Sequence, residues 1–122
     1  ERYATCMDHM NYVGAKDVVM ELVHAANHYI EESAPWNVAK DPARVSELAE
    51  IIYSLLEAIR ISAHLLMPFM PTTSAEVLRR MSLGEDEITS CALEKDCTWG
   101  KLSGGLAVTK GEALFPRLAS AK

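Results

Sequence analysis

The chain has 122 residues, 49% of them hydrophobic and 24% charged, and this ordinary globular composition fits one compact domain rather than two. No apolar run is long enough to span a bilayer and no signal-peptide pattern opens the chain, so we expect no membrane contact and a cytoplasmic location. Three cysteines at no metal-ligand spacing suit a reducing compartment. The net charge of −5 excludes a domain that binds nucleic acid mainly through its phosphates. Any RNA contact must therefore depend on a few specific groups, or on another part of a larger protein.

Apolar residues three and four apart predict helices over residues 1–10 and 15–32. Residues 11–14, Asn-Tyr-Val-Gly, are interpreted as the turn between them, because Asn tolerates the left-handed region and Gly interrupts the periodicity. No capping residue precedes Glu1. We therefore expect this chain to be a fragment that begins within a helix of a longer polypeptide.

Ala34 and Pro35 predict a sharp break after the second helix, because proline fixes its own φ and disfavours helix at the preceding residue. Trp36 follows, at one end of the expected bundle, and two interpretations stay open. It is either a buried plug that closes the end of the bundle, or an exposed aromatic platform of the kind that binds unstacked RNA bases. In the second case Glu31 and Glu32, one turn earlier, are hydrogen-bond acceptors.

Asp41 and Pro42 predict the start of the longest helix, with Asp as N-cap and Pro at the first helical position. Met67-Pro68 predicts its end at about Leu66. Two apolar stripes on this helix indicate that it packs against more than one neighbour at the centre of the bundle. The residues that we expect to be nearly inaccessible to solvent are Ile52, Leu56 and Ile59. The charged residues that we expect on the solvent side are Glu47, Glu50, Glu57 and Arg60.

The rest of the chain is predicted to be less regular. Thr73 and Glu76 have capping-box spacing and predict a short fourth helix to Met81, with Gly84 as its terminator. Residues 85–92 are expected to form one or two helical turns. We expect an irregular C-terminal arm that is compatible with a short strand pair and is anchored to the core at 114–118. For the chain as a whole, we expect a single all-α helical bundle over 1–118 and a tail or linker over 119–122.

No catalytic constellation is present: the serines lack a G-x-S-x-G elbow, and no cysteine is paired with a histidine in a known motif. His24, His28 and Glu31 share one helix face and could hold a metal ion. However, this spacing lacks the further partner and supporting groups of a metal site, so two surface histidines are the alternative. We expect no catalytic residue, no metal and no cofactor in this chain.

Short motifs follow one another in a fixed order along nearly the whole chain. They are Asn27 to Trp36, Ala39-Lys40, Leu56 to Arg60, Leu66 to Pro71, Leu83-Gly84, Thr98-Trp99 and Leu114 to Arg117. This ordered series resembles the anticodon-binding domain of methionyl-tRNA synthetase, a class I aminoacyl-tRNA synthetase. The resemblance implies an α-helical bundle that recognises tRNA by its anticodon, within a parent enzyme that attaches methionine to its tRNA using ATP. It also implies two partners, a methionine-specific tRNA with a CAU anticodon and the catalytic domain of the parent chain, and no activity for this piece alone.

In that family the tryptophan of the Pro-Trp pair stacks near the anticodon, and the acidic residue five before it helps to hold the anticodon bases. Carried over, these residues are Trp36 and Glu31, with Pro35 positioning the ring. Two departures weaken the parallel: His28 stands where the family commonly has Arg or Lys, and the family's Asn and Arg of the first helix lie upstream of Glu1.

Three alternatives remain. One is the anticodon-binding domain of another class I synthetase. Another is a helical protein–protein interaction module in which Trp36 anchors a partner helix. The third is the metal-binding bundle described above.

Overall fold

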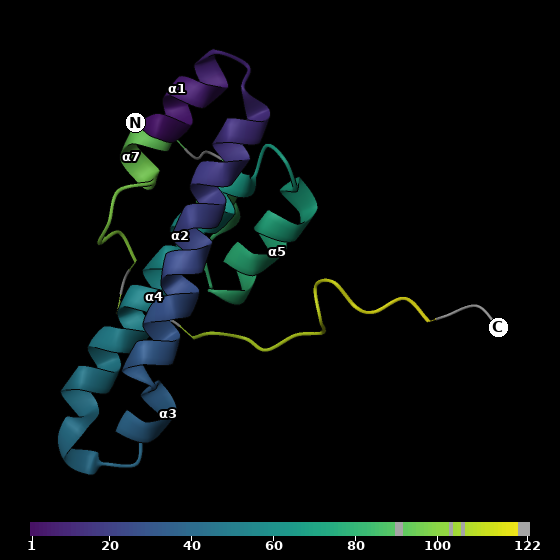
Figure 1. The fold of residues 1–122 in the computed structure, drawn as a ribbon. Helices are drawn as coiled ribbons and strands as arrows, with labels where there is room; N and C mark the ends of the chain where they lie inside the picture. Colours follow the sequence, from purple (N-terminus) through teal and green to yellow (C-terminus); the bar gives the residue numbers. More distant parts are fainter. Residues whose placement is uncertain (90–91, 103, 106, 120–122) are drawn as a thin grey trace.

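Two long antiparallel helices, α2 (Tyr12–Ser33) and α4 (Val45–Leu66), lie side by side and form the body of the protein (Figure 1). Each has 22 residues and is therefore about 33 Å long. The structure, a computed structural model, describes residues 1–89, 92–102, 104–105 and 107–119. The all-α bundle is confirmed, and none of these described residues belongs to a strand. Over the same ranges, no helix combines the length and the hydropathy needed to cross a membrane.

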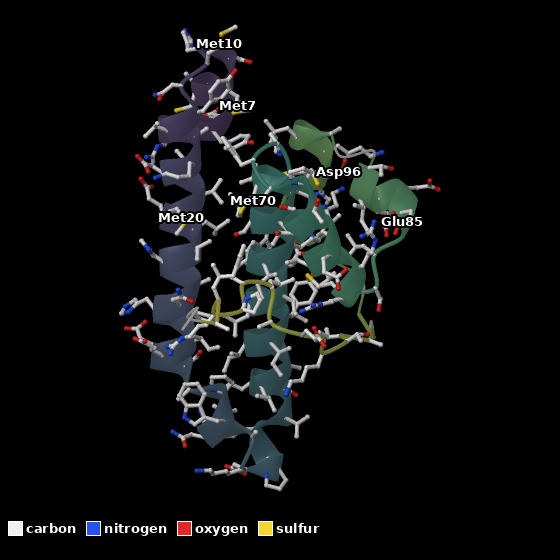
Figure 2. All side chains as sticks on the ribbon, turned by 90° about the vertical axis from the view of Figure 1, so that its right-hand side faces the viewer. Met7, Met10, Met20, Met70, Glu85 and Asp96 are labelled. Atoms are coloured by element: carbon white, nitrogen blue, oxygen red, sulfur yellow. The ribbon has the colours of Figure 1, made fainter. Side chains whose placement is uncertain are left out.

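Shorter helical segments surround this pair. They are α1 (Arg2–Asp8), α3 (Pro35–Val38), the 3₁₀ segment η1 (Pro42–Arg44), α5 (Pro71–Arg80), α6 (Glu85–Thr89) and α7 (Leu93–Asp96). Helix α1 pairs with the start of α2 at one end of the molecule, and α3 lies at the opposite end (Figure 1). Met10, which is 75% exposed, lies on the turn between α1 and α2 (Figure 2). The bundle therefore has two distinct ends, one formed by α1 and α2 and the other by α3.

The start of α2 lies three residues earlier than the sequence predicts. Asn11 is the N-cap of this helix, and its side chain accepts a hydrogen bond from the backbone N–H of Gly14 at 3.0 Å. The expected turn over 11–14 is therefore wrong. A Cβ at Gly14 would lie 2.5 Å from the Asn11 side-chain nitrogen. Glycine thus leaves room for the cap instead of breaking the helix.

Two buried clusters hold the helices together. In the first, Tyr3 of α1 packs with Ala15 and Val19 of α2, and the Tyr3 hydroxyl donates to the Leu65 carbonyl of α4 at 2.7 Å. In the second, Leu78 of α5, which is completely buried, packs with residues of α4 and α6. The short helices α1, α5 and α6 therefore all pack around the C-terminal half of α4.

Helix α4 ends at Leu66 as predicted, but it starts at Val45, because the predicted first turn is the 3₁₀ segment η1, and it presents a different face to the core. Asp41 caps η1, which leads into α4, since its carboxylate accepts from the Ala43 N–H at 2.9 Å. Ile52 and Ile59 are each 44% exposed, and Leu56 is only half-buried, so the predicted inaccessible stripe is wrong. The buried apolar residues of this helix are Ile51, Ala58, Ile61 and Ala63. Periodicity gives the residues that share a face, but with two apolar stripes it cannot tell which one the neighbours cover.

The predicted solvent side of α4 is half right. Glu47 and Glu50 are exposed, whereas Glu57 and Arg60 are buried. The prediction for these two residues is therefore wrong, because they form an ion pair with each other and bind the backbone of a distant segment.

Helix α5 begins earlier than the capping-box interpretation requires. Pro71 occupies its first turn and Met70 precedes it without a side-chain cap. Glu76 instead accepts from Arg80 at 3.0 Å within the helix. The helix ends at Arg80, and Ser82 takes a positive φ of 63°, so Gly84 is not its terminator. The expected short helical turns over 85–92 correspond to α6, with α7 starting at Leu93.

The arm after α7 is irregular, as expected, but its predicted anchor is wrong. The arm is attached near the end of α5, where Thr109 N–H donates to the Arg80 carbonyl at 2.8 Å and Ser82 donates to the Ala107 carbonyl. Beyond this point the chain leads away from the bundle (Figure 1). Phe115 is 70% and Leu118 is 94% exposed, so 114–118 does not pack on the core. Cys91 and positions 120–122 of the predicted tail lie outside the described residues.

Candidate nucleic-acid interface

At the end of the bundle opposite α1, the chain breaks between α2 and α3. Helix α2 stops at Ser33, and Ala34 adopts the left-handed conformation with φ 41° and ψ 63°. Its N–H still donates to the Ile30 carbonyl at 3.1 Å. Pro35 is the first residue of α3, where its fixed φ suits a helix and its missing N–H leaves no donor unpaired. The break predicted at Ala34-Pro35 is confirmed.

Trp36 is exposed at this end, with 56% of its surface accessible. Helix α3 has only one turn and contacts α4, and Val38 in this turn is 3% exposed. Val38 follows Trp36 by two positions, so their side chains point about 200° apart around the helix axis. Burial of Val38 therefore turns Trp36 toward solvent. Of the two interpretations of this residue, the structure supports an exposed aromatic surface and contradicts a buried plug.

The acidic residues near Trp36 lie on the last turn of α2. Glu31 and Glu32 are both exposed. The Glu32 carboxylate lies 3.3 Å from His28 Nε2 on the solvent side of the helix. The structure thus brings Glu31, Pro35 and Trp36 to the same end of the bundle. In the part of the chain that the structure describes, no group of three or more His, Cys, Asp or Glu residues is placed to hold a metal ion.

A buried ion pair on α4 fixes the segment that follows α7, and sequence analysis missed it. Glu57 is 0% and Arg60 is 3% exposed, and Arg60 Nε donates to Glu57 Oε1 at 2.7 Å. The Glu57 carboxylate also accepts from the N–H groups of Gly100 at 2.7 Å and Leu102 at 2.9 Å. Arg60 in turn donates to the Thr98 carbonyl at 2.8 Å. We call this set of interactions the Glu57–Arg60 clamp.

The clamp favours the charged form of the Glu57 carboxylate. Burial raises the pKa of Glu57, but the hydrogen bonds from Arg60 and from the backbone of Gly100 and Leu102 outweigh it, and the net pKa falls below the ordinary 4.5. A buried carboxylate with this many donors is a fixed anion. In the sequence, the clamp is indicated only by an acidic and a basic residue three apart within an apolar stretch of a helix. Its backbone partners lie about 40 residues away and leave no local pattern.

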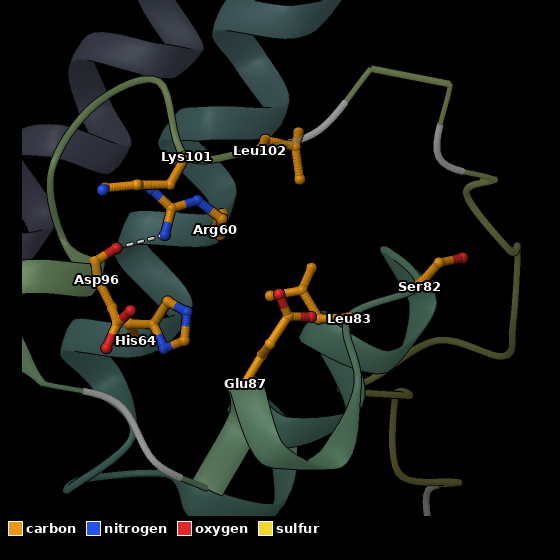
Figure 3. Close-up of a pocket in the computed structure, with 8 residues that line it drawn as sticks. All are labelled: Arg60, His64, Ser82, Leu83, Glu87, Asp96, Lys101 and Leu102. Atoms are coloured by element: carbon orange, nitrogen blue, oxygen red, sulfur yellow. Dashed lines mark hydrogen bonds between the residues drawn. The ribbon is translucent and has the colours of Figure 1, made fainter.

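A polar cavity of about 110 Å³ lies beside the clamp, lined by residues that include Arg60, His64, Glu87, Asp96 and Lys101 (Figure 3). His64 is 5% exposed. Burial, and secondarily the Arg60 charge, lowers the pKa of His64 below 6.5, while Asp96 and Glu87 act in the opposite direction. The ring is therefore neutral at pH 7. Arg60 donates to the backbone carbonyl of Asp96 across this cavity. The cavity therefore belongs to the same structural unit as the clamp.

Comparison with known families decides what these features belong to. A family model described as the anticodon-binding domain of methionyl tRNA ligase matches residues 1–122. The chain belongs to this family. Within the anticodon-binding domain family, the Pro35-Trp36 turn and the clamp both lie in motifs on which the resemblance was based. Leu56 to Arg60 contains both charged members of the clamp, and Thr98-Trp99 lies in the segment that the clamp holds.

Full-length relatives have the name methionine–tRNA ligase. The protein from Bacillus subtilis (strain 168) is 37% identical over 95% of this chain, and that from Streptococcus pneumoniae serotype 4 is 39% identical over 95% of it. The protein from Streptomyces coelicolor is 38% identical over 91% of the chain. The chain spans only 17% to 21% of the length of these relatives. No solved structure matches the chain.

Proposed function

We propose that this chain recognises tRNA by its anticodon, with Trp36 as the surface on which an unpaired base stacks. The observation that carries this proposal is the 56% exposure of Trp36 on a one-turn helix fixed from both sides, by the Ala34-Pro35 break and by the burial of Val38. Exposing a large aromatic residue has no benefit for folding. Stacking on such a residue is worth about 1–3 kcal/mol per base in complexes with single-stranded nucleic acids.

The parent protein in this proposal is a methionine–tRNA ligase, which uses ATP in a separate catalytic domain and works in the cytoplasm. The tRNA is methionine-specific and has a CAU anticodon. Pro35 positions the tryptophan ring, and Glu31, exposed one turn before the break, accepts hydrogen bonds from anticodon bases. A carboxylate is suited to this role because it can accept from the amino groups of bases such as cytosine.

The charge of the chain affects how binding should behave. At a net charge of −5, phosphate contacts contribute little, so affinity depends on stacking and on specific hydrogen bonds. We therefore expect weak binding by these 122 residues alone, best observed at low ionic strength. We also expect the intact ligase to bind more tightly and more specifically.

The test is a titration of the chain with a CAU anticodon stem-loop RNA at low ionic strength. Trp36→Ala should weaken binding by roughly 5- to 150-fold, the range that corresponds to loss of one base stack. Trp36→Phe should keep part of the affinity because it retains a smaller aromatic face. A matched control is Phe115→Ala, which removes an aromatic residue that is 70% exposed on the arm and should change nothing.

The outcomes separate the proposal from its rivals. Equal affinity of wild type and Trp36→Ala, with both proteins folded, would overturn the proposed contact. If changes of the anticodon bases do not alter the affinity for RNA, the chain does not recognise the anticodon and that part of the proposal is wrong. Failure to bind RNA, together with capture of a protein partner through Trp36, would favour the protein–protein interaction module.

A further inference from the structure

The second tryptophan of the chain lies in a groove that the anticodon proposal does not use. Trp99 and Tyr29 line a groove of about 290 Å³ between α2 and α4, with small and apolar side chains as its other walls. Trp99 is 56% and Tyr29 is 38% exposed. Tyr29 lies one helical turn before the end of α2, after which α3 and Trp36 follow. The groove is therefore on the same end of α2 as the proposed anticodon contact.

The Glu57–Arg60 clamp holds Trp99 from both sides along the chain. The residue before it, Thr98, accepts from Arg60, and the residue after it, Gly100, donates to Glu57. Tyr53 of α4 adds a hydrogen bond to the Leu102 carbonyl at 3.1 Å. A buried ion pair is weak evidence for stability, because the desolvation of two charges offsets much of their attraction. Here its clear effect is positional, since it fixes an exposed aromatic residue against α2.

The uncharged lining of the groove makes it more suitable for a nucleic acid base than the acidic surface elsewhere. None of the described residues that line it is acidic, although the chain as a whole carries a net charge of −5. Lys101, two residues after Trp99, is exposed, but it lines the polar cavity beside the clamp and not the groove. A single turn of partner helix, about 10 Å wide and 5.4 Å long, needs more room than this groove offers. A single planar base is small enough for a groove of about 290 Å³.

We propose that the groove between Tyr29 and Trp99 binds a second unpaired base of the tRNA, one that flanks the base at Trp36 in the anticodon loop. This inference rests on the proposed function and extends it from one stacking position to two. Aromatic faces accept any base, so the second position adds affinity more than sequence selectivity.

The two tryptophans of the chain allow each position to be observed separately. Trp36→Phe leaves Trp99 as the only tryptophan, and Trp99→Phe leaves Trp36. Both single-tryptophan proteins are titrated with the CAU anticodon stem-loop RNA, and the quenching of tryptophan emission is measured. The expected result is saturable quenching of Trp99 as well as of Trp36. Tyr29→Ala in the Trp36→Phe protein should reduce the quenching of Trp99 and weaken binding roughly 5- to 150-fold, whereas Phe115→Ala should not.

The possible failures are distinguishable. Quenching of Trp36 without quenching of Trp99 would overturn the second position and leave the proposed function intact. Quenching of Trp99 alone would support an RNA contact in the groove and overturn the contact at Trp36. Quenching of neither would overturn both. Because Trp99 is unaltered in the Trp36→Phe protein, a folding defect of Trp99→Phe cannot obscure the result for the groove, and a thermal melt of Trp99→Phe is the control for the result at Trp36.

Discussion

The two tryptophans are equally exposed, at 56% each, but the chain holds them by different means. Trp36 is placed by local backbone geometry, namely the left-handed Ala34, the fixed φ of Pro35 and the burial of Val38 two residues later. Trp99 is placed by long-range hydrogen bonds from its neighbours to a buried ion pair on α4. The first arrangement is insensitive to charge, and the second depends on it. Mutation and pH should therefore affect the two positions differently.

The largest expected effect comes from breaking the clamp. Glu57→Ala leaves Arg60 buried without its partner and should lower the free energy of unfolding by about 3–5 kcal/mol. It should also release Trp99, seen as a red shift of its emission in the Trp36→Phe protein. The matched control is Glu85→Ala, which breaks an ion pair with Arg79 on the surface and should leave the urea midpoint nearly unchanged. Similar urea midpoints for the two variants would contradict a role for the clamp.

The next effect concerns the Trp36 turn. Val38 is 3% exposed, so Val38→Ala should lower the free energy of unfolding by about 1–3 kcal/mol. It should loosen α3 and change the emission of Trp36 while leaving that of Trp99 unchanged. Val45→Ala is the control, because Val45 is 61% exposed at the start of α4 and should cost less than about 0.5 kcal/mol. A Val38→Ala protein as stable as the control would show that α3 is not anchored by this residue.

Acid should act on the Trp99 segment and not on the Trp36 turn. The pKa of Glu57 is lowered in the folded protein, so the folded state binds fewer protons than the unfolded state near this value. The stability that the carboxylate supplies is present above pH 4.5 and is lost as the pH falls through its lower folded pKa. Melting temperature measured from pH 6 to pH 3 should fall more steeply for wild type than for Glu57→Gln. The buried His64 also lowers stability toward acid, but it is common to both proteins and cancels.

The smallest effect is expected at Ala34. A left-handed conformation costs an L-residue about 1–2 kcal/mol, which glycine avoids, but glycine also gives the unfolded chain about 0.4–1 kcal/mol more entropy. Ala34→Gly should therefore stabilise the protein by about 1 kcal/mol or less, with Trp36 emission unchanged. Ala34→Val should destabilise it, because a β-branched residue tolerates this φ poorly. A loss of stability for the glycine variant, measured by urea unfolding, would argue against the left-handed turn.

The difference between local and long-range interactions also explains which features of the fold could be predicted from the sequence. The Ala34-Pro35 break and the Asp41 cap depend on neighbouring residues, and both were predicted at the right positions. Glu57 and Arg60 were assigned to solvent, because their partners are backbone groups in an irregular segment about 40 residues away, which no periodicity indicates. Ile52 and Ile59 were assigned to the core, because an apolar stripe does not say which neighbour covers it. Phe115 and Leu118 were assigned to the core on their hydrophobicity alone.

The exposure of Trp36 was left open by the sequence for a related reason. A tryptophan after a Pro-containing break can pack inward or point outward. The outcome depends on Val38, whose burial directs Trp36 away from α4. The resemblance identified the residue, and the one-turn helix supplies the physical reason for its exposure.

The most direct test of the anticodon proposal uses the intact ligase with Trp36→Ala. Two steady-state activities are compared with wild type, aminoacylation of tRNA and ATP–pyrophosphate exchange, with thermal melts as a folding control. Loss of one base stack should lower kcat/KM for tRNA by about one to two orders of magnitude. Pyrophosphate exchange should be unchanged, because activation of methionine requires no anticodon. Parallel loss of both activities together with a lower melting temperature would contradict the proposal and make Trp36 a structural residue.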